Sequence, residues 1–305
     1  MGALLISLAL IGGLIKGFSG KGISRDVESL SDGFTVNIIR SFFCTVISLA
    51  IVLISAEPGA LALDGASLVV CLASSVFMCV FAVAWLYAYK SEAYVFLSVF
   101  TMLGSVLTAL LSHFIYGDEL KITRIIGMAV LFVAVYITSL YNKNIKGKMT
   151  TKGVITLVLG ASGAALADFM QKVFTKEGLG SAYAFNFYTY ALMLLPQLIL
   201  LLIIFYCRAR RSEKRLTPGE LLNKKLFDRR HIIICAMIAV GLYLNSLSKT
   251  LATEYVPSTQ LYPTLQALNL IASAILAAIL FKEKITAKSA IGISVALGAV
   301  LLMNI

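Results

Sequence analysis

The 305-residue chain is poor in charge and in the residues that enzymes use for chemistry. Only 13% of its residues are charged, whereas soluble domains average about 25%. It has two histidines, and it contains no His-Glu-x-x-His, no Gly-x-Ser-x-Gly and no phosphate-binding Gly loop. These absences argue against a soluble domain, against the common hydrolase classes and against an ATP-driven machine.

Metal-binding patterns are missing as well. The five cysteines form no Cys-x-x-Cys pair and no cluster with histidine, which a structural metal site would need. We therefore expect neither a metal nor a cofactor, and we expect the cysteines to act as small apolar packing residues. They are Cys44, Cys71, Cys79, Cys207 and Cys235.

Long apolar runs are what the sequence has in abundance. The chain is 59% hydrophobic, and a run of about 20 apolar residues is long enough to cross the hydrocarbon core of a bilayer as a helix. Ten such runs predict an all-α integral membrane protein of ten transmembrane helices, and we expect the first run to be retained rather than removed as a signal peptide. The runs are Gly2–Gly20, Thr35–Ala56, Ala66–Tyr89, Tyr94–Tyr116, Ile122–Tyr141, Gly153–Thr175, Ala182–Cys207, Ile232–Leu251, Pro257–Phe281 and Ala287–Asn304.

The net charge of +11 is distributed unevenly over the loops. Nineteen of the 26 Lys and Arg residues follow odd-numbered runs, nine of them in the loop 208–230, and four follow even-numbered runs. This is the positive-inside pattern of membrane proteins rather than a site for nucleic acid, so we expect no nucleic-acid partner. It predicts cytoplasmic odd-numbered loops and both termini on the opposite face.

Two stretches of the chain are repeated. YGDELKITRIIG at Tyr116–Gly127 aligns without a gap with FKEKITAKSAIG at Phe281–Gly292, 165 residues further on. GGLIKGFSGK at Gly12–Lys21 lines up in the same way with GAALADFMQK at Gly163–Lys172. Both pairs hold equivalent places relative to the apolar runs, so the chain is predicted to be an internal repeat.

The repeat divides the chain into two five-helix halves. We expect residues 1–141 to form the first, 142–152 the linker, and 153–305 the second, with the basic loop 208–230 inside it. Because five is an odd number, the second half must be inverted in the membrane relative to the first. Many secondary transporters use such inverted repeats, with a substrate site at the repeat interface near the bilayer midplane.

This arrangement resembles the drug/metabolite transporter superfamily, specifically its EamA-type members. Arg40 in NIIRSFF resembles an arginine early in the family's second helix, and LYP at Leu261–Pro263 resembles its ninth-helix proline motif, although Leu97–Leu103 in the first half lacks the equivalent proline. The resemblance implies a basket of helices 1–4 and 6–9 around a central cavity, with helices 5 and 10 peripheral. It also implies cytoplasmic termini, the reverse of the charge pattern, so both orientations stand.

Ionisable residues inside the runs are the candidate site, because each is costly in lipid unless it is paired or faces a wet cavity. Asp168 is the one carboxylate deep in a run, and Lys172 follows one helical turn later, so we expect the two to pair. Asp168 is interpreted either as a proton- or substrate-coupling acid or as a structural ion pair. Lys16 and Arg40, together with Lys172, would make the cavity electropositive and favour a carboxylate or phosphate. The alternative is that Lys16 snorkels and that Arg40, about five residues into its run, lies near the interface.

Amide and aromatic side chains in the second half form a further group of substrate-binding candidates. They could line a wet core or simply join helices by hydrogen bonds. Pro263 should kink its helix and is a candidate gate. The group comprises Asn186, Tyr243, Asn245, Gln260, Tyr262 and Gln266.

The favoured function is a secondary active transporter in the cell membrane, not an enzyme. It would move a small-molecule substrate, a metabolite such as an amino acid, through the bilayer by alternating access, with protons considered as the coupling ion. The alternatives are a multidrug exporter of amphipathic compounds and a lipid-linked sugar flippase. The small four-helix relatives that export lipophilic cations use a glutamate in their first helix, where this chain has Lys16.

Overall fold

A computed structural model describes residues 1–24, 26–55, 61–90, 94–140, 151–211, 223–281 and 287–305. Within these residues the chain is helical and contains no strand. Residues 142–150 of the predicted linker, the middle of the basic loop and the start of the second repeated turn lie outside the described residues, and the last two residues of the predicted linker already belong to a helix.

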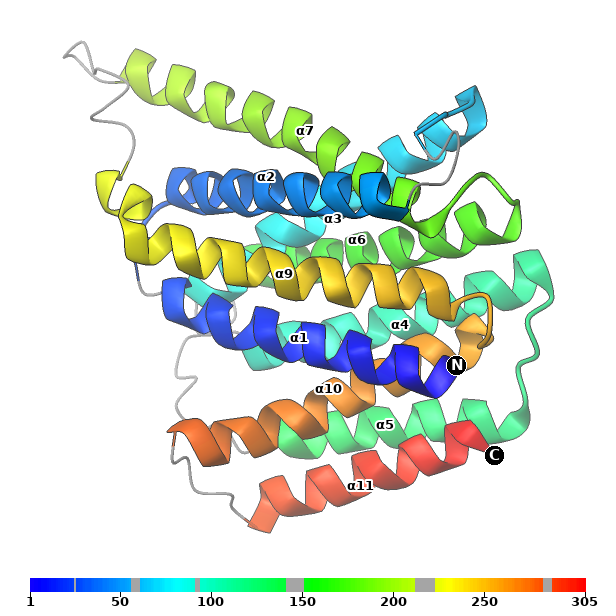
Figure 1. Ribbon diagram of the computed structural model, residues 1–305. Coiled ribbons are helices and arrows are strands. Elements are labelled where there is room, and N and C mark those ends of the chain that lie inside the picture. Colours follow the sequence, from blue (N-terminus) through cyan, green and yellow to red (C-terminus); the bar gives the residue numbers. More distant parts are fainter. Residues whose placement is uncertain (25, 56–60, 91–93, 141–150, 212–222, 282–286) are drawn as a thin grey trace.

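Ten α-helices and one short 3-10 helix account for the described residues (Figure 1). They agree closely with the ten predicted runs. The largest difference is at α2, which begins at Leu30 rather than Thr35 and so places Arg40 about 15 Å from its start. The elements are α1 (Gly2–Ser24), α2 (Leu30–Ser55), α3 (Gly65–Lys90), α4 (Tyr94–Tyr116), α5 (Ile122–Leu140), α6 (Thr151–Lys176), α7 (Ala182–Arg211), η1 (Lys224–Phe227), α9 (Arg229–Ala252), α10 (Ser258–Phe281) and α11 (Ala287–Asn304).

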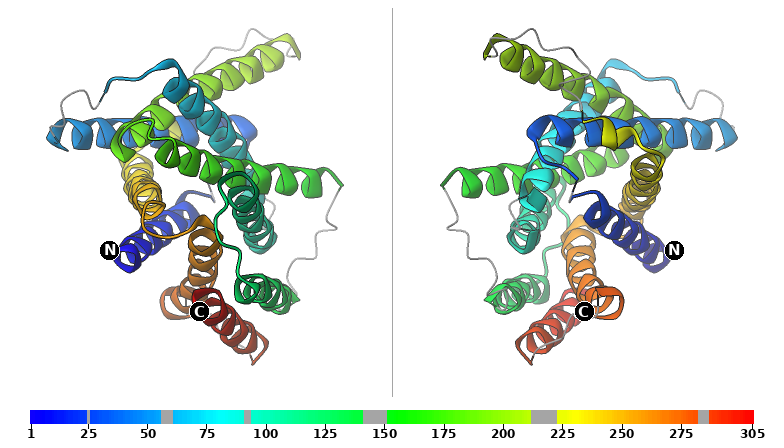
Figure 2. Two further views of the ribbon diagram at one scale, coloured as in Figure 1. Left: turned by 90° about the vertical axis from the view of Figure 1, so that its right-hand side faces the viewer. Right: turned by 90° about the vertical axis from the view of Figure 1, so that its left-hand side faces the viewer.

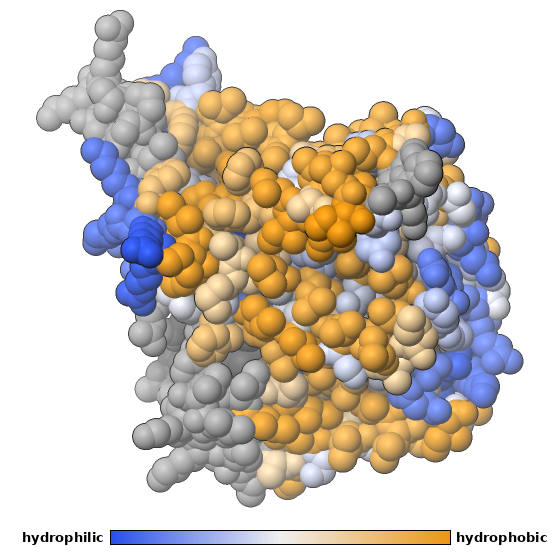
Figure 3. Space-filling view, viewed as in Figure 1, coloured by the Kyte–Doolittle hydropathy of each residue, from blue (hydrophilic) through white to orange (hydrophobic). Residues whose placement is uncertain are grey.

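The surface identifies a membrane protein. Among the described residues, six helices (α1, α2, α3, α6, α7 and α9) are long and apolar enough to cross a bilayer. Large apolar side chains point outward, and Ile54 and Phe114 are each 79% exposed. Figure 3 shows these side chains as a broad apolar band between two hydrophilic edges. A helix satisfies its backbone polar groups internally, which lets such a band lie in lipid.

The packing of the helices has the symmetry of two inverted halves. The first helix of each half, α1 or α6, packs on the third helix of the other half, α9 or α3. The third helix of each half, α3 or α9, also packs on the second helix of the other half, α7 or α2. The pairs α2 with α7, α4 with α10 and α5 with α11 each join one helix to its counterpart. A two-fold axis that exchanges α1–α5 with α6, α7, α9, α10 and α11 produces this pattern, as expected for an inverted repeat.

Two glycines at equivalent positions make close contacts between the halves. A Cβ on Gly12 of α1 would lie 2.6 Å from the Gly241 carbonyl oxygen of α9, and one on Gly163 of α6 would lie 2.8 Å from the Phe77 carbonyl oxygen of α3. Gly12 and Gly163 are the residues that head the second pair of repeated stretches. Each therefore lets the first helix of a half approach the third helix of the other half.

α5 and α11 lie at the edge of the bundle, as the resemblance implied. They pack against each other, α5 also against α4 and α11 also against α10, and the end-on views of Figure 2 place them at the lower edge of the molecule. Their contact is a cluster of small and apolar residues that includes Met128, Leu131, Ala299 and Met303. The remaining eight helices enclose the polar interior.

The chain termini lie at one end of the bundle (Figure 1). The amino group of Lys121, just before α5, contacts the carbonyl oxygen of Ile305 at 3.3 Å, and Gly2 lies against Val256. We call this end the terminus face. The other end, here called the basic face, carries Arg208 and Lys224.

Candidate functional site

A small cavity lies inside the bundle, between helices of both halves. Its volume is about 10 Å³, close to the smallest that holds one water. α1, α2 and α3 line it from the first half, and α7 and α9 from the second. The lining residues are Lys16, Arg40, Ser41, Met78, Phe81, Trp85, Tyr190, Met193 and Leu242.

Two cations face this central cavity. Arg40 is only 4% exposed, and its guanidinium carbon lies 5.1 Å from the centroid of the Trp85 ring. The amino group of Lys16 lies 5.9 Å from the centroid of Phe81. Within the described part of the chain, neither cation has a carboxylate within ion-pair distance, and the Arg40 Nε has no hydrogen-bond partner. The structure thus brings together the two residues that the alternative interpretation placed near the membrane interface.

The predicted pairing of Asp168 with Lys172 is wrong. Asp168 forms an ion pair with Lys249 of α9, and Lys172 forms one with Asp118, at 3.2 Å, in the turn between α4 and α5. Lys249 lies within α9, near its C-terminal end. Spacing along one helix identifies a partner only on that helix, whereas Asp168 and Lys172 both face side chains from other segments.

Further bonds hold these two ion pairs in place. The Tyr262 hydroxyl donates to the backbone oxygen of Asp168 at 2.7 Å, and its ring lies beneath the Lys249 amino group, 5.9 Å from nitrogen to centroid. One turn of helix separates Asp168 from Lys172 along α6. We call the two pairs together the ion-pair layer.

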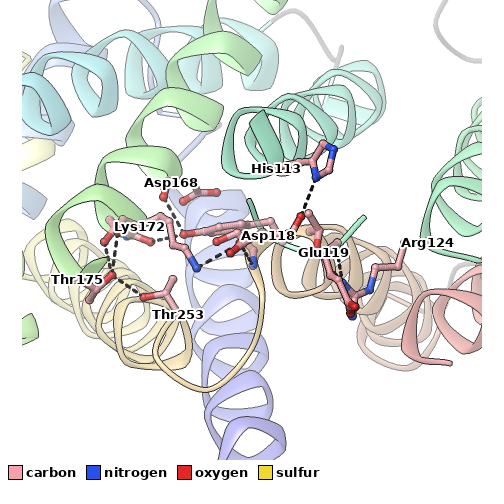
Figure 4. Close-up of polar contacts among 12 residues, drawn as sticks. His113, Asp118, Glu119, Arg124, Asp168, Lys172, Thr175 and Thr253 are labelled. Carbon is pink, nitrogen blue, oxygen red and sulfur yellow. Dashed lines mark hydrogen bonds and ion pairs between the residues drawn. The ribbon is translucent and has the colours of Figure 1, made fainter. Parts of the chain in front are cut away.

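The turn between α4 and α5 supports the layer from the first half (Figure 4). Asp118 accepts a hydrogen bond from the Ser258 backbone N–H at 2.9 Å, and its own carbonyl oxygen lies 2.8 Å from the His113 Nδ1. Arg124 donates to the Glu119 carbonyl oxygen and to the Thr259 hydroxyl, the latter at 2.9 Å. This turn is the first copy of the repeated stretch, and its acid joins α6 to the start of α10.

A cleft of about 310 Å³ opens on the terminus face. Both Asp118 and Lys172 line it, so one pair of the ion-pair layer forms part of its wall. Asp168 lies one turn further from the cleft along α6. The lining residues are Asp118, Lys172, Thr175, Lys176, Thr253, Glu254, Tyr255, Val256 and Pro257.

The other predicted residues have mainly structural contacts. The Asn186 side chain donates to Thr250 at 3.2 Å, and the Asn245 side chain donates to the Ala9 carbonyl oxygen at 2.7 Å, so both join neighbouring helices. Gln260 contacts Arg124 and Asn304 near the terminus face. Tyr243 and Gln266 line neither the cavity nor the cleft, and α10 continues through Pro263.

Sequence reasoning missed Lys249 and Arg124 as members of this region. Both stand near the ends of predicted runs, where a cation usually meets water or lipid headgroups. Asp118 had a signal, because it is the acid of the repeated turn. Among the described residues, no group of three or more His, Cys, Asp or Glu side chains could hold a metal ion.

Comparisons with known proteins agree with this architecture. A family model described as the EamA-like transporter family matches residues 3–140 and 151–305. An uncharacterized transporter of Archaeoglobus fulgidus is 26% identical over 298 residues, which cover 98% of this chain and 97% of that protein. One solved crystal structure superposes with a TM-score of 0.69 at 12% identity, over 98% of this chain and 96% of its own, a likeness that shows the fold alone.

Proposed function

Since the chain belongs to the EamA-like transporter family, and is therefore a multi-pass membrane transporter and not an enzyme, we propose that it is a secondary active transporter of small metabolites. It would carry its substrate across the cell membrane by alternating access, with the substrate in the central cavity and with protons as the coupling ion. The described residues offer no nucleotide-binding loop, so a gradient would supply the energy.

One observation carries this proposal: a cleft on one face is separated from a buried cationic cavity by a layer of ion pairs. The cleft has about 310 Å³, but the cavity has only about 10 Å³. Along α9, Lys249 lies between Leu242, which lines the cavity, and Thr253, which lines the cleft. It pairs with Asp168 of α6. A transporter whose site is closed to the terminus face requires such a barrier.

The basic face is bridged in a similar way. The His231 Nε2 of α9 lies 3.0 Å from the Asp26 carboxylate in the turn between α1 and α2, and Arg208 of α7 donates to the Ser31 hydroxyl at 2.9 Å. Both contacts join the first half to the second. With polar bridges at both ends and a cavity that holds about one water, the arrangement supports an occluded state. Rocking of the halves would break one set of bridges at a time.

Asp168 is proposed as the coupling acid. Protonation of its carboxylate would remove the charge that holds Lys249, and the released lysine would weaken the ion-pair layer. The pair is largely buried, with side-chain exposures of 14% for Lys249 and 12% for Asp168. A change of charge here would therefore be felt strongly, because little solvent screens it.

The test is counterflow in proteoliposomes loaded with amino acids and small carboxylates, with and without a pH gradient. The variants are Asp168→Asn, the double variant Asp168→Asn/Lys249→Met, and the control Asp228→Asn, an exposed acid whose side chain makes no capping bond. We expect both Asp168 variants to keep exchange and lose only the pH-driven component, while the control matches wild type. Unchanged pH-driven transport in the folded double variant would show that Asp168 is a structural partner only.

The alternative functions have less support. A multidrug exporter of amphipathic cations would place its substrate beside Lys16 and Arg40, which repel it. No observation on the described residues specifically favours a lipid-linked sugar flippase.

A further inference from the structure

We infer that the central cavity binds an organic anion, a carboxylate with an apolar body and no ammonium group, rather than a zwitterionic amino acid. This inference rests on the proposed function, because it names the substrate class of the same cavity. It follows from the charges that line the cavity and from the nature of its walls.

Buried charges elsewhere in the described bundle are compensated. Lys172 pairs with Asp118, and Lys249 pairs with Asp168. Arg124 donates to three acceptors, two of them the side chains of Thr259 and Gln260. This is the usual state of ions in a protein interior, since an isolated buried charge is very costly.

Lys16 and Arg40 are the exception. Arg40 is 4% exposed, and its contact at the cavity is the face of Trp85. The amino group of Lys16 faces Phe81 in the same way. The Nε of Arg124, like that of Arg40, lacks an acceptor, but the terminal nitrogens of Arg124 are bonded to oxygens. A ring face attracts a cation less strongly than a carboxylate does, so the positive charges of Lys16 and Arg40 are only partly compensated by their aromatic neighbours. A carboxylate in the cavity would satisfy both, and the planar guanidinium could bind it through two parallel hydrogen bonds.

The lining of the cavity also disfavours a ligand with an ammonium group. Among the described residues no Asp or Glu lines the central cavity, so a bound ammonium would have no anionic partner there and would face two positive charges. An amino acid carries such a group beside its carboxylate and would lose much of the attraction that the carboxylate gains. The matching carboxylic acid without the amine avoids this repulsion.

The walls determine the rest of the ligand. Apolar side chains from α3, α7 and α9 form most of the lining, namely Met78, Phe81, Trp85, Met193 and Leu242. Ser41 and Tyr190 are the polar neutral groups, and the Tyr190 hydroxyl already donates to the Leu242 carbonyl oxygen at 3.2 Å. A strongly hydrated inorganic anion would exchange its water for this apolar surface at a loss, whereas an apolar body that enters when the halves rock apart would pack against it.

The chain contains its own reporter for the test. Trp85 is the single tryptophan of the protein and lines the cavity beside Arg40, so its fluorescence reports binding there directly. The full-length protein in detergent is titrated with 3-phenylpropanoate, with phenylalanine and with 3-phenylpropanamide, which share a phenyl body and differ in charge. A second series, 4-methylpentanoate and leucine, repeats the comparison with an aliphatic body.

We expect a saturable fluorescence change with the two carboxylates, and affinity weaker by about tenfold or more for the amino acids and the amide. Lys16→Met and Arg40→Gln should each weaken carboxylate binding by a similar factor, and Arg40→Lys should restore part of it. Because Arg40 variants alter the surroundings of Trp85, ligand-induced shifts in Tm are measured in parallel. Arg210→Gln is the matched control, an arginine over the ring of Tyr206 and away from the cavity, and should bind as wild type does.

The inference and the proposed function can fail separately. Carboxylate binding that depends on Arg40, without counterflow of any solute, would leave the inference standing and remove the proposed function. Counterflow of amino acids or cations without carboxylate binding would support transport and overturn the inference. Equal affinity for phenylalanine and 3-phenylpropanoate, or carboxylate binding that survives both Lys16→Met and Arg40→Gln, would also overturn it.

Discussion

Lys249 of α9 and Asp168 of α6 form an ion pair, although 81 residues separate them in the chain. The pair lies inside the bundle, one turn of α6 further from the open cleft than the Lys172–Asp118 pair. Asp168 thus connects α6 to α9, and Lys172 connects α6 to the turn between α4 and α5. Since that turn belongs to the first half and α9 to the second, α6 is tied to both.

Removing either member of the Lys249–Asp168 pair should destabilise the protein strongly. Lys249→Met or Asp168→Asn leaves one buried group without its partner, and such single changes cost about 3–5 kcal/mol. The double variant removes both charges, so we expect its loss of stability to be much smaller than the sum of the single losses. Thermal unfolding in detergent measures the stability of the wild type, the two single variants and the double variant, with Asp228→Asn as the control. Additive losses would mean that the two side chains do not interact in the folded protein.

The same pair shows what the sequence could and could not predict. Hydrophobicity determines where a helix can cross a membrane, so the apolar runs placed nearly all helix ends within a few residues. The start of α2 was missed because Ser31 and Asp32 read as a polar loop, whereas in the structure Ser29 and Asp32 form a capping box. The Ser29 hydroxyl accepts from the Asp32 N–H at 3.2 Å, and the Asp32 carboxylate accepts from the Ser29 N–H at 2.9 Å.

Side-chain partners depend on how helices pack, and one sequence contains little of that information. Arg40 and Lys16 were recognised as charges in apolar runs, but only the bundle shows that they face one cavity. Lys249 lies three residues before the end of α9, where a lysine is usually expected to reach the membrane–water interface. The Gly12–Lys21 alignment did carry packing information, because its first glycine and Gly163 make equivalent contacts.

The contact between α1 and α9 should tolerate no added methyl group at Gly241. A Cβ there would lie 2.7 Å from both the Gly12 carbonyl oxygen and the Lys16 backbone nitrogen, so α1 must shift. We expect Gly241→Ala to lower the stability by about 1–3 kcal/mol and, because Lys16 moves, to weaken ligand binding at the cavity.

Gly298→Ala is the matched control for this change. Gly298 also lies within a helix, but no atom lies within 4 Å of its added Cβ. Its replacement should be neutral or should stabilise the protein by up to about 1 kcal/mol, since alanine favours the helix. Thermal unfolding and the Trp85 titration compare the two variants, and similar effects at both positions would show that close packing is not the cause.

The orientation of the chain in the membrane can be measured with two introduced cysteines. Lys224→Cys, in η1, lies on the basic face, and Glu254→Cys, which lines the cleft, lies on the terminus face; both positions are exposed. In a Cys207→Ser background the four remaining cysteines are buried, so they should react slowly. The charge distribution predicts that a membrane-impermeant maleimide labels intact cells at position 254 and not at 224. The reverse pattern would establish the cytoplasmic termini that the family resemblance implied.

The turn that carries Asp118 should control local opening at the terminus face. Asp118 accepts from the Ser258 backbone N–H at 2.9 Å and so caps the first turn of α10 next to the open cleft. Asp118→Asn keeps the shape but removes the charge, and it also weakens the hold on Lys172. A lost cap costs about 1–2 kcal/mol, so amide hydrogen exchange in the first turn of α10 should become roughly fivefold to thirtyfold faster.

A second cap at the other end of the bundle provides the control. Asp32 accepts from the backbone N–H groups of Glu28 and Ser29 at 3.1 and 2.9 Å, before the first turn of α2. Asp32→Asn should speed exchange there and leave α10 unchanged, while Asp118→Asn should do the opposite. If both variants speed exchange at both ends, the two faces open together, and the independent closure that alternating access requires is absent from this protein.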